Sequence, residues 1–151
     1  MLVNLDYVLK KAREEKYAVG LFNTTDTDAL EGVIRAAEET NSPVIIGTAE
    51  VLLQYGDFEL LAPGMIEIAK NAKVPVVVNF DHGLTFDQCI KAIKYGFTSI
   101  MFDGSLHGDE ENLRATREMV KIAHSFGVSV EGEIGHVGVV DEEQEDRKSV
   151  V

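Results

Sequence analysis

The sequence has very little cysteine and no long apolar run. Cys89 is the single cysteine among 151 residues, so no disulfide can form within one chain. This usage fits the reducing cytoplasm, which is the location we predict. The first residues lack a basic segment followed by a long apolar stretch, and no apolar run is long enough to cross a bilayer. We therefore expect neither a signal peptide nor a membrane span.

Basic residues are also few. The chain has 14 Lys and Arg residues against 26 Asp and Glu residues, which gives a formal net charge of -12. Nucleic acids and anionic membrane surfaces attract basic proteins, so this balance argues against both as partners. A phosphorylated small molecule is not excluded, because a local positive site or a few backbone N–H groups are enough to bind it.

Several common functional motifs are missing. The sequence contains no glycine-rich dinucleotide fingerprint and no nucleotide P-loop. It also contains no Gly-x-Ser-x-Gly elbow, so a serine hydrolase is unsupported.

What the sequence does contain is an alternation of short apolar runs with longer amphipathic stretches. Strands are predicted over 18–22, 43–47, 74–80, 99–102 and 128–133, and helices over 5–15, 27–39, 60–71, 85–95 and 110–126. Thr27 or Asp28 is expected to cap the second helix, and Thr85 the fourth. This alternation predicts an α/β fold with a parallel sheet and right-handed crossovers. An open doubly wound sheet fits, and so does the opening portion of a (β/α)₈ barrel, which typically has about 250 residues.

Small polar or acidic side chains follow each predicted strand. In chain order they are Asn23, Thr48, Asp81 with His82, Asp103 with Ser105, and Glu131 with Glu133. Adjacent parallel strands would bring these side chains together at one edge of the sheet. An imidazole with several carboxylates suits a divalent cation, and zinc is favoured if more histidines join.

Each of these residues also has a plain structural interpretation. His82 would serve as a helix cap, Asp81 as a turn or cap residue, and Asp103 lies in Asp-Gly-Ser, a common turn composition. We favour a metal ligand for His82 and an acid or base for Asp81, because polar groups at the end of a buried strand need water, a metal or a substrate. His107 and His124 are expected at the surface.

Three motifs, taken in order, carry a resemblance. Residues 79–83 (Asn-Phe-Asp-His-Gly), 101–105 (Met-Phe-Asp-Gly-Ser) and 130–135 (Val-Glu-Gly-Glu-Ile-Gly) resemble the class II, zinc-dependent fructose-bisphosphate aldolases, a family that includes tagatose-bisphosphate aldolases. The early stretches 21–23 and 41–46 are similar as well. The resemblance implies a (β/α)₈ barrel that reversibly cleaves a ketose bisphosphate, either fructose 1,6-bisphosphate or tagatose 1,6-bisphosphate, to dihydroxyacetone phosphate and glyceraldehyde 3-phosphate. It also implies zinc as the Lewis acid that polarises the ketone.

The resemblance further implies roles for individual residues. His82 resembles the first zinc ligand, and Asp81 the residue that moves the proton of the substrate C4 hydroxyl. Asp103 and Glu133 resemble acidic residues around the zinc and a second cation site. The remaining matches are Asn23 and Thr48, in substrate-contacting positions, and Asp141, in a mobile loop that serves the carbon-acid proton step.

The sequence departs from the family pattern at particular places. Asn79 stands where the family usually has histidine, and Val139 where it has the second of two glycines. The family's other zinc histidines and its phosphate-binding segments lie on later strands. We therefore expect residues 1–151 to form the N-terminal part of a single barrel domain with about five of its eight strands.

These departures lead to expectations for the isolated chain. We predict weak zinc binding and little or no activity, and exposed strand edges that promote association. The complete protein is expected to be a homo-oligomer. One alternative is a non-catalytic fragment, or a subunit that docks onto a partner supplying the other strands; another is a small open α/β binding domain.

Overall fold

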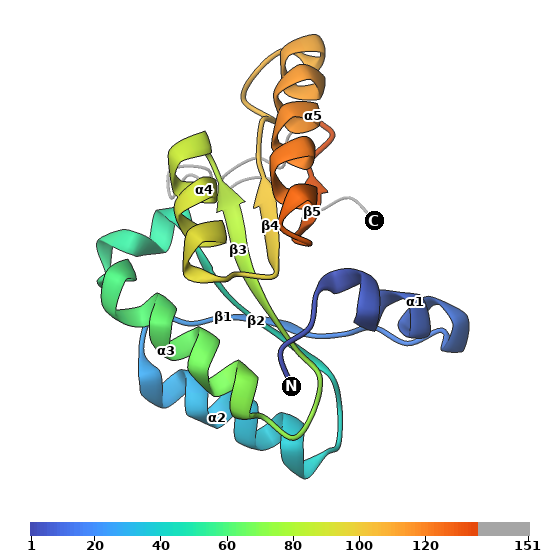
Figure 1. Cartoon of the computed structure of the whole chain (residues 1–151), viewed down its shortest axis with the longest axis vertical. Helices are drawn as coiled ribbons and strands as arrows, with labels where there is room; N and C mark the ends of the chain where they lie inside the picture. Colours follow the sequence, from blue (N-terminus) through green and yellow to red (C-terminus); the bar gives the residue numbers. More distant parts are fainter. Residues whose placement is uncertain (136–151) are drawn as a thin grey trace, which may run out of the picture.

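The computed structural model describes residues 1–135 as one parallel sheet with its crossover helices (Figure 1). The strands are β1 (Leu21–Asn23), β2 (Val44–Ala49), β3 (Val76–Gly83), β4 (Ser99–Phe102) and β5 (Ser129–Gly132). The helices are α1 (Leu5–Glu15), α2 (Thr27–Glu39), the short 3₁₀ helix η1 (Glu50–Gln54), α3 (Phe58–Asn71), α4 (Phe86–Tyr95) and α5 (Asp109–Ser125). The predicted alternation is therefore present, with strand ends shifted by a few residues.

The order of the strands decides between the two predicted architectures. The five strands lie side by side in sequence order, and every neighbouring pair is parallel. A doubly wound sheet reverses its strand order at a switch point, whereas a (β/α)₈ barrel adds its strands consecutively. The described residues therefore form five consecutive strands of a barrel, as the resemblance implied.

Two apolar layers cover the two faces of the sheet. Val44 and Ile46 of β2 belong to the larger core, which packs against α2, α3, α4 and α5. Ile45, between them, points to the opposite face, where it joins Val8 of α1 and Val77 of β3. The face covered by α2–α5 is thus the outside of the barrel, and the face that meets α1 is its interior.

Local side chains determine where the helices begin. Asn4, Asp26, Asp57 and Thr85 each accept a hydrogen bond from a backbone N–H in the first turn of the following helix. The prediction that Thr85 caps α4 is confirmed. The cap of α2 is Asp26, in place of the predicted Thr27 or Asp28. Asp26 has an extended backbone, and its carboxylate accepts from the Ala29 N–H at 2.8 Å.

None of the helices in residues 1–135 has both the length and the apolar character needed to cross a membrane.

Candidate metal and proton-transfer site

The site begins with an irregularity at the end of β3. Phe80 pairs with Ile100 of β4, but the next registered pair is Gly83 with Phe102, so Asp81 and His82 together oppose one residue, Met101. His82 has a left-handed backbone (φ 43°), which is uncommon for a residue other than glycine. Such a bulge redirects a side chain that would otherwise point to the other face. The bulge explains how the side chains of two consecutive residues, Asp81 and His82, both reach the interior face at the end of the sheet.

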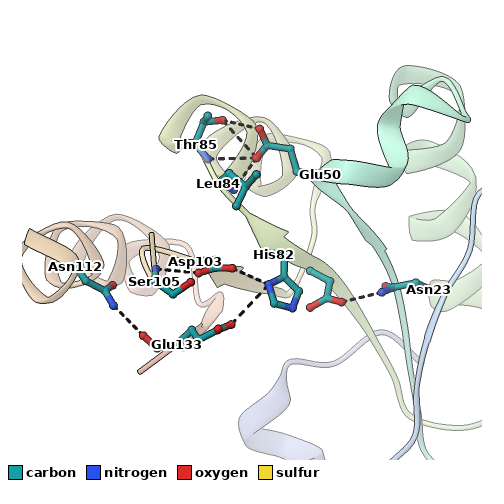
Figure 2. Close-up of polar contacts among 10 residues, drawn as sticks. Asn23, Glu50, His82, Leu84, Thr85, Asp103, Ser105, Asn112 and Glu133 are labelled. Carbon is teal, nitrogen blue, oxygen red and sulfur yellow. Dashed lines mark hydrogen bonds and ion pairs between the residues drawn. The ribbon is translucent and has the colours of Figure 1, made fainter. Parts of the chain in front are cut away.

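The His82 ring lies among carboxylates from the next two strands (Figure 2). Its Nδ1 is 2.8 Å from Asp103 Oδ2 and 3.7 Å from Glu133 Oε2. The side chains of Asp103 and Glu133 are only 9% and 11% exposed, whereas that of His82 is 44% exposed. The carboxylates are therefore held in the protein while the imidazole remains open to a ligand.

These contacts change the acidity of the groups. The hydrogen bond to Asp103 raises the pKa of His82; burial opposes this shift, and the charges of Asp81, Asp103 and Glu133 reinforce it. Burial alone would raise the pKa of Asp103, but hydrogen bonds from Ser105 and His82 outweigh it and lower that pKa. An anionic Asp103 therefore faces an imidazole that holds its proton more strongly than a free histidine does.

The neighbouring carboxylate, Asp81, is oriented from β1. Asn23 donates from Nδ2 to Asp81 Oδ2 at 2.7 Å, although β2 lies between the two strands. Gly47 of β2 leaves room for the Asn23 side chain to reach Asp81, because a Cβ there would come within 2.5 Å of Asn23 Oδ1.

Desolvation, together with the nearby charge of Asp81, raises the pKa of Glu131. Asp81 is thus one member of a set of mutually repelling acids.

Backbone and helix contacts hold the two carboxylate-bearing segments. The Ser105 N–H donates to Asp103 Oδ1 at 2.9 Å. Asn112 of α5 donates from Nδ2 to the Glu133 carbonyl at 2.8 Å, and the Thr116 hydroxyl donates to Asn112 Oδ1 at 3.1 Å. Glu133 is therefore anchored to α5, whereas Asp103 is held by the turn that follows β4.

Some predicted site residues are not brought to this group. Thr48 is only 1% exposed and pairs in register with Phe80, which packs in the core under the outer helices. Thr48 thus lies on the outer face of the sheet, away from Asp81. Asp141 lies outside the described residues. His107 and His124 are exposed, in line with their predicted place.

Sequence reasoning missed Glu50, at the start of η1. Its carboxylate accepts hydrogen bonds from the backbone of Leu84 and Thr85, directly after His82-Gly83 (Figure 2). No local pattern distinguishes this glutamate from an ordinary surface acid, because its partners are more than 30 residues away in the chain.

The donor set fits a divalent cation. One ligand atom from each of His82, Asp103 and Glu133 lies within 4.8 Å of the other two. Imidazole nitrogen with carboxylate oxygen is a ligand combination that zinc accepts, and catalytic zinc sites commonly use three protein ligands and leave a position open. A single imidazole is fewer than most such sites contain, so this set is a partial one for zinc.

The comparisons with known proteins agree with this fold. The family model "Fructose-bisphosphate aldolase class-II" matches residues 3–151, and the chain belongs to this family. It is 42% identical over 154 residues to a fructose-bisphosphate aldolase of Helicobacter pylori, covering 100% of this chain and 50% of the relative. It is 39% identical over 144 residues to the 6-phospho-5-dehydro-2-deoxy-D-gluconate aldolase of Halalkalibacterium halodurans, covering 93% and 50%.

A solved structure gives the same result for the fold. The YdjI aldolase from Escherichia coli K12 superposes with a TM-score of 0.86 and 37% sequence identity, covering 91% of this chain and 54% of that one. The chain therefore spans about half the length of the aldolases it matches.

Proposed function

We propose that this chain forms the first five β/α units of a zinc-dependent class II aldolase domain, one that reversibly cleaves a phosphorylated ketose to dihydroxyacetone phosphate and an aldehyde. The observation that carries the proposal is the convergence of His82, Asp103 and Glu133 from three consecutive strands, with Asp81 beside them. In a (β/α)₈ barrel, the carboxyl ends of the strands are where active sites are built.

The residues divide into two groups by chemistry. His82, Asp103 and Glu133 would hold the zinc ion, with a second cation served by the same acidic surroundings. When bound, zinc supplies Lewis acidity toward the substrate carbonyl. Asp81 takes the proton of the substrate C4 hydroxyl during cleavage and returns it during synthesis. The Asn23 amide fixes the orientation of the Asp81 carboxylate through their 2.7 Å hydrogen bond.

The substrate class is proposed from the family and from the printed names of the relatives. Those names include fructose-bisphosphate aldolase and 6-phospho-5-dehydro-2-deoxy-D-gluconate aldolase, so the shared feature is a phosphorylated sugar or sugar acid. Fructose 1,6-bisphosphate is the first substrate to test, followed by tagatose 1,6-bisphosphate.

The experiment measures zinc binding and turnover on the purified chain. Zinc affinity is obtained by competition with a chromophoric chelator for the wild-type chain, His82→Ala and the surface control His124→Ala. We expect weak binding that His82→Ala abolishes and His124→Ala leaves unchanged. Zinc binding that survives His82→Ala would contradict the proposed site.

Turnover is measured in the same preparations with fructose 1,6-bisphosphate, with added zinc and after chelation. We expect little or no cleavage by the chain alone, because about three strands of the barrel are supplied by the remainder of the fold. Chelator-sensitive cleavage would mean that association of chains completes the site.

A second candidate function is docking as a non-catalytic subunit. β1 and β5 are the outer strands of the described sheet, and an apolar groove of about 550 Å³ runs along β1 and α2, lined by Phe22, Val33 and Ala36 among others. A partner that supplied further strands would cover both edges. Recovery of metal-dependent cleavage on addition of such a partner would favour catalysis over a purely structural role.

A further inference from the structure

The loop after His82 is held by a single carboxylate, that of Glu50 at the start of η1. Glu50 Oε2 accepts from the Leu84 N–H at 2.7 Å and from the Thr85 N–H at 3.2 Å. The Thr85 hydroxyl donates to Glu50 Oε1 at 3.2 Å. Figure 2 shows these bonds side by side, with the His82 ring lying on the same segment of chain. One side chain therefore binds two consecutive backbone donors and a hydroxyl.

The same loop is constrained from its other side. A Cβ at Gly83 would collide with Cys89 Sγ and would lie 3.1 Å from both the Met101 carbonyl oxygen and Phe80 Cδ1. Gly83 is therefore pressed against β4 and α4, while Glu50 holds Leu84 and Thr85. The backbone between these two constraints has little freedom to change.

His82 immediately precedes this constrained segment and has the left-handed backbone (φ 43°) that places its ring. A residue other than glycine keeps such a conformation only when its surroundings enforce it. If the loop relaxed to an ordinary extended backbone, strand alternation would turn the ring away from Asp103 and Glu133. The position of the ring therefore depends on what holds the loop.

We propose that Glu50 is a positioning residue for the metal site: it fixes the β3–α4 loop and so keeps His82 in the conformation that faces Asp103 and Glu133. Its hydrogen bonds to backbone N–H groups are charge-assisted, which makes them stronger than neutral ones. Glu50 touches neither the ring nor the carboxylates, so its effect passes through the backbone. This inference rests on the proposed metal site.

The test compares three variants of the full chain. Glu50→Ala removes all of the acceptors, and Glu50→Gln keeps one carbonyl oxygen that can accept from the Leu84 and Thr85 amides. Glu59→Ala is the matched control, because it removes a carboxylate that pairs with Lys91 at 3.0 Å and does not touch the loop. Zinc affinity, hydrogen exchange of the Leu84 and Thr85 amides, and urea unfolding are measured for each.

We expect Glu50→Ala to lower zinc affinity about tenfold or more, in the range seen when supporting residues around a metal are lost. Exchange of the two amides should accelerate in that variant. Glu50→Gln should lie between Glu50→Ala and wild type in both measurements, and Glu59→Ala should match wild type. A uniform loss of stability cannot produce this pattern, because it would accelerate exchange throughout the sheet.

Wild-type zinc affinity and slow amide exchange in Glu50→Ala would overturn the proposal. Accelerated exchange with unchanged zinc affinity would overturn it as well, because the loop would then be shown not to control the ring. Absence of His82-dependent zinc binding in the wild-type chain would instead refute the proposed function. In that case the exchange data alone would still decide whether Glu50 holds the loop.

Discussion

His82 combines a rare backbone conformation with two carboxylate neighbours. Its ring nitrogen faces Asp103 at 2.8 Å and Glu133 at 3.7 Å, so the acids proposed to hold a metal ion also favour a proton on the ring. At the proposed site, a cation and the proton would therefore compete for this imidazole. Because the competition takes place at a single side chain, it should be measurable in the pH dependence of zinc binding.

Zinc affinity of the chain is expected to rise with pH. The pKa of His82 is raised above its ordinary value of 6.5, mainly by the hydrogen bond to Asp103, so the ring is protonated over a wider range of pH than a free histidine. Below that raised pKa, each pH unit should weaken binding about tenfold, since one proton must leave. Zinc titrations at pH 6 and pH 8, with His82→Ala and His124→Ala as comparisons, check this. A pH-independent affinity in the wild-type chain would contradict it.

In the metal-free chain the same pKa shift makes a rise in pH unfavourable, because it affects the stability of the fold instead of zinc affinity. A raised pKa means that the His82–Asp103 contact stabilises the fold fully below about pH 6.5 and loses this contribution as pH rises through the folded pKa. The contribution is small, because the His82 side chain is 44% exposed and solvent screens the pair. Zinc affinity is therefore the more sensitive measurement.

Asn79 is the second residue-scale feature. It is 1% exposed, and neither atom of its amide group has a hydrogen-bond partner among the described residues. A buried, unpaired amide costs about 1–3 kcal/mol. We expect Asn79→Leu, which has a similar volume, to raise the free energy of unfolding by about 1 kcal/mol in urea titrations.

Ser99 offers a comparison for this prediction. It pairs in register with Asn79, and its buried hydroxyl also has no partner among the described residues. Ser99→Ala should therefore be neutral or mildly stabilising. A loss of more than about 1 kcal/mol in Asn79→Leu would mean that the amide makes an interaction that leucine cannot replace.

At the scale of elements, several constraints coincide at the junction of β3 with α4. The register shift, the left-handed His82, the close contacts of Gly83 and the hydrogen bonds that Glu50 accepts from Leu84 and Thr85 all fall within a few residues. Thr85 then caps α4 through the Gln88 N–H. This element transition, more than any regular strand, gives the site its geometry.

Gly83→Ala tests how tightly this junction is packed. The added methyl group would meet Cys89 Sγ and the Met101 carbonyl, so we expect a loss of about 1–3 kcal/mol in the free energy of unfolding. Gly64→Ala is the control, because Gly64 lies inside α3 with nothing within 4 Å of the new Cβ. That substitution should stabilise the chain by about 0.5–1 kcal/mol. Equal effects of the two changes would show that the junction accommodates a side chain.

At the scale of the whole molecule, the feature that matters for association is the pair of edge strands of the described sheet, β1 and β5. β1 has Phe22 50% exposed beside the apolar groove on α2, and β5 is the opposite edge of the described sheet. Sheet edges and exposed apolar surface both promote contact between chains. The isolated chain is therefore expected to associate.

Sedimentation velocity at several concentrations measures this association. We expect larger species as concentration rises, and Phe22→Lys should reduce them, because a charge at a strand edge opposes pairing with another chain. Leu60→Lys, on the outer surface of α3 where Leu60 is 78% exposed, should have a smaller effect. A wild-type chain that remains monomeric at all concentrations would contradict the prediction.

The sequence by itself determined the α/β alternation, the Thr85 cap of α4 and the family, because apolar periodicity, a capping side chain and strand-end motifs are local signals. It also placed His82, Asp103 and Glu133 at the ends of strands, from which the parallel topology brings them together. Only the tertiary structure decided the strand order, the outward face of Thr48, the left-handed backbone of His82 and the role of Glu50. Each of these depends on the register between strands and on partners distant in the chain, which no local pattern encodes.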